Sequence, residues 1–269
     1  MGQTTRRDFV TASVMTFSGM LLARARAAAS AGNAPSGRAP DPQLIDDLVS
    51  ANHILSSEGV VDAYGHVSTR HDGNPGRYLL SRDLAPALVT AEDILEYDLD
   101  SNPIDARGRS QYLERFIHGE IYRARPEVKA IVHNHAPAVI PFSLSRVPLR
   151  PVFHMAAFVV EGIPVFDAPR DLGIHQLLIA TPQLGQALAR TLADKPAVLI
   201  RGHGATVVGA SLPMAVGRSV YLERSARIQA EAVALGGELT YLDPEAARAM
   251  VDNAYPRAWE LWKRQVRSR

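Results

Sequence analysis

The chain has 269 residues, of which 46% are hydrophobic and 21% charged, so it can bury the core of one large domain. A formal net charge of +1, without a long basic run, argues against a nucleic-acid-binding surface. The chain has no cysteine, which excludes disulfides, thiolate nucleophiles and Cys-ligated zinc, so a metal would be held by His, Asp or Glu.

The first 31 residues have the pattern of a twin-arginine export signal. Arg6 and Arg7 precede a mildly apolar run at residues 10–23, which is too short and too weakly apolar for a stable membrane anchor. A disordered basic tail and a start codon chosen too early are the alternatives. We expect export by the Tat machinery to the periplasm, with a cytoplasmic location as the alternative.

A linker rich in Gly, Pro, Ser and Ala is expected over residues 32–40, and a catalytic domain over 41–269. Asp41 and Pro42 are typical of a helix start, and apolar residues recur at helical spacing as far as Leu55. Short strand-like stretches follow at 66–70, 78–80 and 94–99. Turn residues between them favour antiparallel pairing.

The second half continues to alternate between helix and strand patterns. Helices are expected at about 111–123, 182–193, 212–235 and 244–266, and strands at 128–132 and 197–201. The chain therefore predicts an α/β fold of three layers, α/β/α, with helices on both faces of a central mixed or antiparallel sheet.

Two strand-like runs end in histidines. His133 and His135 follow an apolar run and lie two residues apart, so both imidazoles can point to the same side of an extended backbone. His203 ends a second such run and is flanked by Gly202 and Gly204, which allow close backbone approach. A polar strand end is the alternative for the first pair alone. The three histidines together predict a metal site with open positions for substrate.

The chain resembles the class II aldolase and adducin superfamily over roughly residues 41–237. The matching strings are Gly65-His66-Val67-Ser68-Thr69-Arg70, Glu114-Arg115-Phe116-Ile117-His118, Ala124-Arg125-Pro126-Glu127-Val128, Val132-His133-Asn134-His135-Ala136 and Arg201-Gly202-His203-Gly204. The resemblance implies a class II aldolase-like fold, metal ligation by His133, His135 and His203, and a homotetramer. It also implies that Glu114 reaches the metal or carries a proton, which a pKa raised by a dry pocket would favour.

The chain departs from the sugar-phosphate aldolases of this family at positions that bind substrate. Those enzymes usually carry Gly-Asn-Val-Ser where this chain has Gly65-His66-Val67-Ser68, so His66 replaces an asparagine. They also usually carry two serines where this chain has Tyr112 and Leu113. Loss of two hydroxyl donors weakens the case for a phosphate. Met155 stands where those aldolases tend to carry a tyrosine.

The strings at residues 112–122 and 137–142 resemble instead the branch that decarboxylates hydroxy-carboxy-muconic semialdehydes and dihydroxyphthalates. In that branch Ser81, Arg82 and His154 are also matched, and Arg82 suits a substrate carboxylate. A salt bridge of Arg82 with Asp83 or a neighbour is the alternative. His118 and His154 are either substrate or supporting contacts, or structural histidines.

We therefore expect a metal-dependent carbon–carbon lyase that stabilises an enolate and decarboxylates a small carboxylate substrate. Glu114 and His154 are the predicted catalytic residues, and Ser81, Arg82, His66 and His118 the predicted substrate contacts. Zn²⁺ is the expected ion, with Mn²⁺ or Fe²⁺ as alternatives. A sugar-phosphate aldolase, an Fe(II)-dependent oxygenase and a non-catalytic adducin-like scaffold are the alternative functions.

Overall fold

The computed structural model describes residues 38–250 and 255–268. The predicted export signal lies outside this described part, and the predicted linker enters it only at residue 38. Both assignments stay predictions. In the described ranges, no helix is long and apolar enough to cross a membrane.

Seven strands form one sheet in the order β3-β2-β1-β4-β7-β6-β5. Neighbouring strands are antiparallel except β5 and β6, which are parallel, so the sheet is mixed as predicted. The strands are β1 (His66–Arg70), β2 (Arg77–Ser81), β3 (Ile94–Asp98), β4 (Ala130–Asn134), β5 (Val165–Phe166), β6 (Ala197–Ile200) and β7 (Gly204–Gly209).

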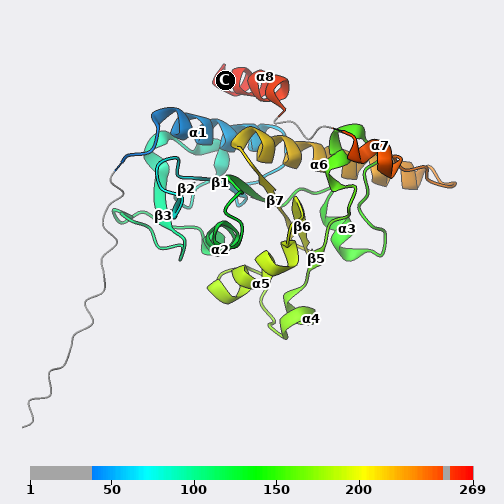
Figure 1. The fold of residues 1–269 in the computed structure, drawn as a ribbon, viewed down its shortest axis with the longest axis horizontal. Coiled ribbons are helices and arrows are strands. Elements are labelled where there is room, and N and C mark those ends of the chain that lie inside the picture. The colour runs from blue at the N-terminus through cyan, green and yellow to red at the C-terminus, as the bar shows by residue number, and fades with distance from the viewer. Residues whose placement is uncertain (1–37, 251–254, 269) are drawn as a thin grey trace, which may run out of the picture. The chain divides into compact units, whose positions relative to one another are not determined.

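Helices cover both faces of the sheet (Figure 1). They are α1 (Pro42–Ser57), α2 (Phe116–Ala124), α3 (Ile140–Leu144), α4 (Ala168–Leu172), α5 (Pro182–Leu192), α6 (Leu212–Ala234), α7 (Pro244–Arg248) and α8 (Pro256–Arg267). Ile131 of β4 shares a core with Ile117 of α2, whereas the next residue, Val132, shares a core with Leu55 of α1. Successive strand side chains thus serve opposite faces.

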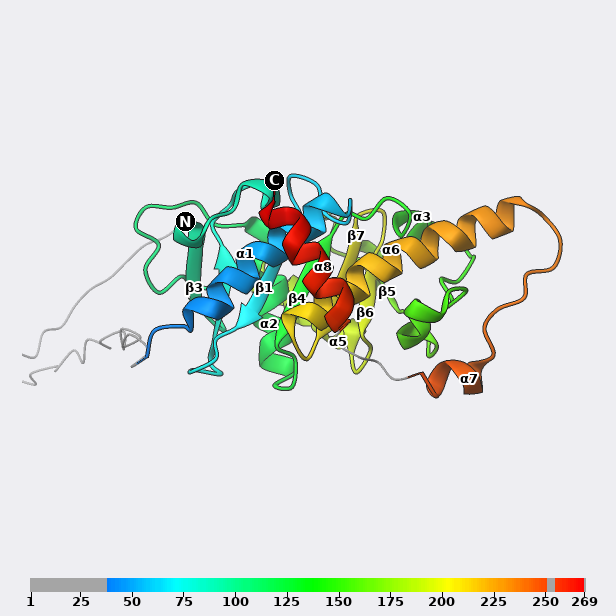
Figure 2. The same cartoon turned by 90° about the horizontal axis from the view of Figure 1, so that it is seen from above.

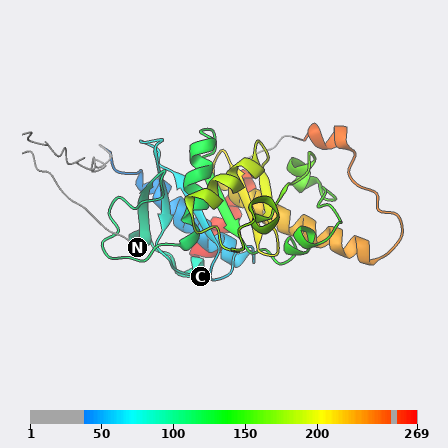
Figure 3. The ribbon, with the colours of Figure 1, turned by 90° about the horizontal axis from the view of Figure 1, so that it is seen from below.

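Different helices form the two helical layers. The α2 and α5 helices, green and yellow-green, lie in front of the sheet in Figure 3. On the other face α1 and α6 cover the sheet, and α8 lies over both of them (Figure 2). Trp259 and Trp262 of α8 share a core with residues of α1 and α6. The predicted three-layer α/β/α fold is confirmed.

Two predicted helices are interrupted. The region 111–123 contains a 3₁₀ turn, η3 (Leu113–Arg115), before α2, because Glu114 has non-helical dihedral angles of φ −90° and ψ 16°. The region 244–266 contains α7 and α8 instead of one helix. Pro256 begins α8, and a proline has no amide proton with which to continue a preceding helix. The strands β5 and β7 were not predicted.

Candidate metal centre

Three predicted ligands stand where adjacent strands end. His133 belongs to β4, and His135 lies just beyond the end of that strand. His203 lies in the turn between β6 and β7, and β7 pairs with β4. A Cβ atom on Gly204 would lie only 1.9 Å from the carbonyl oxygen of Asn134. Glycine is therefore required for this turn to approach β4 so closely.

Glu114 from η3 completes a cluster of four. One donor atom from each of Glu114, His133, His135 and His203 lies within 4.8 Å of the others. The Nε2 atoms of His135 and His203 are 3.1 Å apart. Glu114 Oε2 is 3.4 Å from His133 Nε2 and 3.5 Å from His203 Nε2. Since His135 and His203 are partly exposed while His133 is fully buried, the cluster is accessible from the side of the first two.

This donor set fits a divalent cation. His133 Nε2 is enclosed, and among the described residues no group hydrogen-bonds to it, which is costly for a polar atom. A tetrahedral zinc ion with Zn–N bonds of about 2.0–2.1 Å would separate its ligand atoms by about 3.3–3.4 Å. Three of the six separations in the cluster, at 3.1, 3.4 and 3.5 Å, are similar, and the others are within 4.8 Å. Imidazole and carboxylate ligands do not choose between zinc, manganese and iron.

The two exposed histidines are oriented by groups that the sequence did not reveal. Asp62 Oδ1 lies 3.1 Å from His135 Nδ1, and the Leu177 carbonyl oxygen lies 3.1 Å from His203 Nδ1. Both acceptors favour a proton on Nδ1 and leave Nε2 free for a metal. For Asp62, the only indication in the sequence is its position shortly before the string that begins at Gly65. Leu177 contributes only its backbone carbonyl, so the sequence gives no indication of its role.

Glu114 is held as a carboxylate. Its Oε1 accepts a hydrogen bond from the Ile179 amide at 2.7 Å. Burial raises the pKa of Glu114, but the neighbouring His133 and His203 outweigh burial and hold that pKa well below its usual range. This is the opposite of the raised pKa expected for a dry pocket. The pKa of His203 is lowered by burial, yet Glu114 reverses the effect and the net shift is upward.

His66 and His118 lie beside the cluster. His66 on β1 stands opposite His133 on β4, with ring centroids 5.1 Å apart. His66 Nδ1 is 2.7 Å from His118 Nε2, and His118 Nδ1 is 2.6 Å from Ser68 Oγ. His118 is completely buried. Because both of its ring nitrogens are engaged inside the protein, the predicted substrate contact of His118 does not fit the structure.

Ser81 and Arg82 lie at the end of β2. Ser81 is buried, with its Oγ 3.3 Å from the Tyr112 hydroxyl. Arg82 Nε donates to Asp93 Oδ1 at 2.6 Å, so the ion-pair partner is Asp93 rather than Asp83. The Arg82 side chain is still 34% exposed. Substrate contacts by Ser81 and Arg82 stay predictions.

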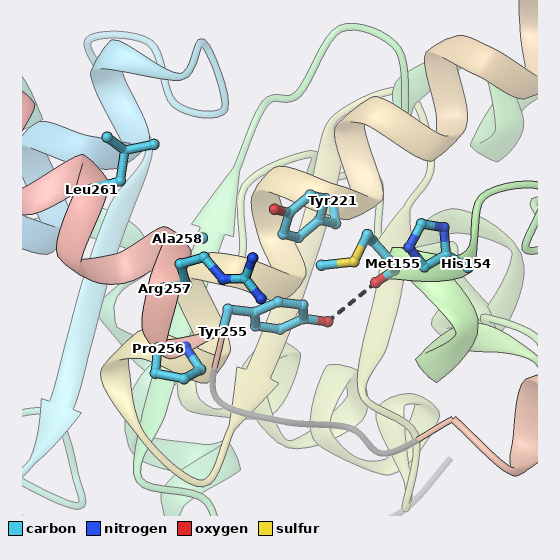
Figure 4. A pocket seen from close by; sticks show the side chains of 8 residues that line it. All are labelled: His154, Met155, Tyr221, Tyr255, Pro256, Arg257, Ala258 and Leu261. Atoms are coloured by element: carbon cyan, nitrogen blue, oxygen red, sulfur yellow. Dashed lines mark hydrogen bonds between the residues drawn. The ribbon is translucent and has the colours of Figure 1, made fainter.

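His154 lies apart from the cluster. It begins the 3₁₀ segment η4 (His154–Val159) and lines an open, mainly apolar groove of about 650 Å³ (Figure 4). Tyr221 of α6 and Leu261 of α8 line the same groove, and the Tyr255 hydroxyl donates to the Met155 carbonyl at 3.2 Å. In the part of the chain that is described, no hydrogen bond or ion pair joins His154 to the metal ligands. Its catalytic role stays a prediction.

Residues 46–230 match the family described as the Class II Aldolase and Adducin N-terminal domain. The chain belongs to this family. It is 35% identical over 245 residues to the decarboxylase tropJ of Talaromyces stipitatus, covering 81% of this chain and 92% of that protein. It is 32% identical over 202 residues to a 3,4-dihydroxyphthalate decarboxylase of Arthrobacter keyseri, covering 71% and 79% respectively.

A solved structure shows the same fold. An L-fuculose 1-phosphate aldolase from Glaciozyma antarctica has a TM-score of 0.70 at 23% identity, covering 84% of this chain and 89% of that one. The comparisons together confirm the predicted superfamily and its decarboxylase-like branch. The class II aldolase protein described here is accordingly a lyase.

Proposed function

We propose that this class II aldolase homologue is a metal-dependent decarboxylase of a small hydroxy- or oxo-dicarboxylic acid from aromatic breakdown. The observation that carries the proposal is the cluster of Glu114, His133, His135 and His203. The relatives of this protein that are named as decarboxylases support the choice of decarboxylation as the reaction. Zinc is the proposed cation, with manganese and ferrous iron as the alternatives.

Glu114 has the position and the charge for the proton transfers. When bound, a divalent cation would polarise a carbonyl or hydroxyl oxygen of the substrate and stabilise the negative charge that develops there. Because its pKa is low, Glu114 starts as a carboxylate. With His133, His135 and His203 holding the cation, Oε2 of Glu114 would be free to take the proton of the substrate hydroxyl, which the cation would make more acidic. The bond to the departing carboxylate then breaks, CO2 leaves, and the electron pair stays on the substrate carbon. Glu114 returns the proton to that carbon.

The residues near the cluster favour a carboxylate over a sugar phosphate. The Tyr112 hydroxyl donates to the Leu84 carbonyl, and its ring centroid lies 4.5 Å from that of His66. Leu113 has no hydrogen-bonding side chain. These two residues therefore offer none of the free donors that a phosphate dianion needs. The exposed part of the Arg82 guanidinium is the proposed partner of a substrate carboxylate.

The deciding experiment incubates the zinc-, manganese- or iron-loaded protein with 3,4-dihydroxyphthalate, carboxy-muconic semialdehydes and ketose 1-phosphates. Release of CO2 and of aldehyde are followed separately. We expect CO2 from an acid at a kcat of about 1 s⁻¹ or more, and no aldehyde. Aldehyde from a ketose phosphate without CO2 from any acid would contradict the proposal.

The same incubations distinguish an oxygenase. Oxygen uptake is recorded with iron-loaded protein under air, and CO2 release is recorded without oxygen. A decarboxylase needs no oxygen, so we expect CO2 release to continue under nitrogen. CO2 release that requires stoichiometric oxygen uptake would favour the Fe(II)-dependent oxygenase.

We further infer a homotetramer, because the family resemblance implies this assembly. Leu113 precedes Glu114 in the chain, and the Leu177 carbonyl bonds to His203. These two leucines are 62% and 74% exposed in the single chain. Apolar exposure of this kind is consistent with an interface near the site. Light scattering of the purified protein is expected to give four times the chain mass.

A further inference from the structure

A chain of buried polar side chains runs inward from His66. On β1, His66 and Ser68 share one face because they are two residues apart, and on α2, His118 and Tyr122 share one face because they are four apart. The two pairs interleave. His66 Nδ1 is 2.7 Å from His118 Nε2, His118 Nδ1 is 2.6 Å from Ser68 Oγ, and Ser68 Oγ is 2.9 Å from the Tyr122 hydroxyl. All four side chains are at most 1% exposed.

The two imidazoles are neutral. Both rings are enclosed, the His66–His118 bond needs one ring nitrogen without a proton, and among the described residues neither ring bonds to a carboxylate, so the charged form is disfavoured. Each ring therefore carries one N–H, and all donors along the chain must point in the same direction. One direction leaves an N–H on His66 Nε2, and the other leaves a lone pair there.

The inner end of the chain selects the direction. The Tyr122 hydroxyl lies 3.5 Å from the Lys129 carbonyl oxygen. That oxygen already accepts the Arg70 amide at 2.8 Å and the Thr69 hydroxyl at 3.1 Å. A carbonyl oxygen has two lone pairs, so these two shorter bonds occupy it. The 3.5 Å hydrogen bond from Tyr122 to this occupied oxygen is therefore the weaker of its two contacts, and the 2.9 Å contact favours donation by the Tyr122 hydroxyl to Ser68.

The donors then run outward and end at His66. Ser68 donates to His118 Nδ1, and His118 Nε2–H donates to His66 Nδ1. The remaining proton of His66 must lie on Nε2. Among the described residues this nitrogen has no hydrogen-bond partner, and it is not one of the enclosed unpartnered atoms, so it keeps a small exposed area within a side chain that is 1% exposed. The His66 ring lies next to that of His133.

We propose that His118, Ser68 and Tyr122 are positioning residues that hold His66 as its Nε2–H tautomer, and that this N–H binds a carboxylate oxygen of the substrate beside the metal ligands. The choice of a carboxylate rests on the proposed function, whereas the tautomer does not. Such a preformed donor would be aimed at the site before the substrate arrives.

The tautomer can be measured in metal-free protein labelled with ¹⁵N-histidine. Spectra of the His66→Gln and His118→Gln variants assign the two rings. We expect an unprotonated, pyridine-type Nδ1 and a protonated, pyrrole-type Nε2 in both rings. A protonated Nδ1 in either ring overturns the proposal, whatever the activity of the enzyme.

Substitution of His118 tests the positioning role. His118→Phe keeps an aromatic ring but removes both hydrogen bonds, so we expect mixed His66 tautomers and a kcat/KM for 3,4-dihydroxyphthalate about 10–100-fold lower. His118→Gln, whose amide can donate to His66 Nδ1, should restore the Nε2–H tautomer and part of the activity. Tyr97→Phe is the control, because the buried Tyr97 hydroxyl has no hydrogen-bond partner among the described residues. Full kcat/KM in His118→Phe with an unchanged unfolding temperature overturns the proposal.

Phthalate, which carries two carboxylates but no hydroxyl, is the probe for anion binding. Added to zinc-loaded protein, it is expected to shift the His66 Nε2–H proton resonance. A resonance that stays unshifted throughout the titration overturns the anion-binding role, even where dihydroxyphthalate is decarboxylated. A shift in a protein that decarboxylates no acid supports the inference and shows that the proposed function failed instead.

Discussion

At the scale of single residues, Asp62 shows how an exposed group can serve a buried site. Its side chain is 54% exposed, yet its Oδ1 orients His135. Asp62→Asn removes the charge and keeps an acceptor, so we expect zinc affinity to fall by about 10-fold. The unfolding temperature of the metal-free protein should stay the same, because exposed ion pairs contribute little.

Competition with a chelator measures this affinity. Asp105→Asn is the matched control, since Asp105 is 58% exposed and pairs with Arg107 away from the cluster. Equal zinc affinities in the two variants would show that His135 needs no charged partner.

Glu114 has to carry a proton as well as a charge. Glu114→Gln keeps the acceptor for the Ile179 amide but cannot take up the substrate proton. We expect about one zinc per chain in this variant and a turnover lower by about 10²–10⁴-fold. Metal analysis and CO2 release check the two parts. Glu120→Gln is the control, because Glu120 is a buried acid in the helix α2 that follows Glu114. Unchanged turnover in Glu114→Gln would remove Glu114 from the mechanism.

At the scale of elements, the turn between β6 and β7 depends on one close approach. Gly204→Ala would push a methyl group against the Asn134 carbonyl of β4 and separate the two histidine-bearing strand ends. We expect a loss of about 1–3 kcal/mol of unfolding free energy and loss of zinc binding. Urea unfolding and metal analysis test this. In Gly76→Ala, the new atom meets only the flexible Asn74 side chain, so wild-type behaviour is expected there.

The short 3₁₀ turn η2 (Ala91–Asp93) anchors Arg82. Burial raises the pKa of Asp93, but hydrogen bonds from Arg82 and Thr90 outweigh burial, so the pKa of Asp93 lies below its usual value. Since the folded pKa is below the unfolded one, the stabilisation is present above about pH 4 and is lost as pH falls through the folded pKa.

Asp93→Asn should therefore cost about 1–3 kcal/mol of unfolding free energy at pH 7. The difference from wild type should shrink as the pH falls below about 4. Urea unfolding at several pH values measures both. A pH-independent difference would mean that the charge of Asp93 does not contribute, and would leave Arg82 free for another partner.

Local patterns predicted most of these elements but not all contacts between them. The strand-end histidines follow from short sequence strings, and α1 begins at Asp41 and Pro42 as expected. Glu114 interrupts its predicted helix because its carboxylate is drawn to the cluster and to the Ile179 amide, a tertiary effect that helical spacing does not encode. Leu177 orients His203 through its backbone carbonyl, and a backbone contact of this kind cannot be predicted from the residue type.

At the scale of the whole molecule, the proposed role of the N-terminal arginines Arg6 and Arg7 is to set where the protein works. We propose Tat-dependent export, which accepts folded proteins and would allow the metal to be loaded before transport. Arg6→Lys with Arg7→Lys is expected to keep the precursor in the cytoplasm. Fractionation and immunoblotting measure this, with Arg24→Lys plus Arg26→Lys as the control pair. Unchanged periplasmic yield in the first double variant would show a different route or none.

The segment between α4 and α5 holds two metal-site side chains by its main chain alone, through the Leu177 carbonyl and the Ile179 amide. The side chains of Leu177 and Leu178 take no part in these bonds and are 74% and 41% exposed. Mutation can therefore alter their size and polarity while both ligands stay in place. In evolution or in the laboratory, substitutions at these two positions can therefore change the surface beside the cluster, including the proposed subunit interface, without removing the hydrogen bonds that hold His203 and Glu114.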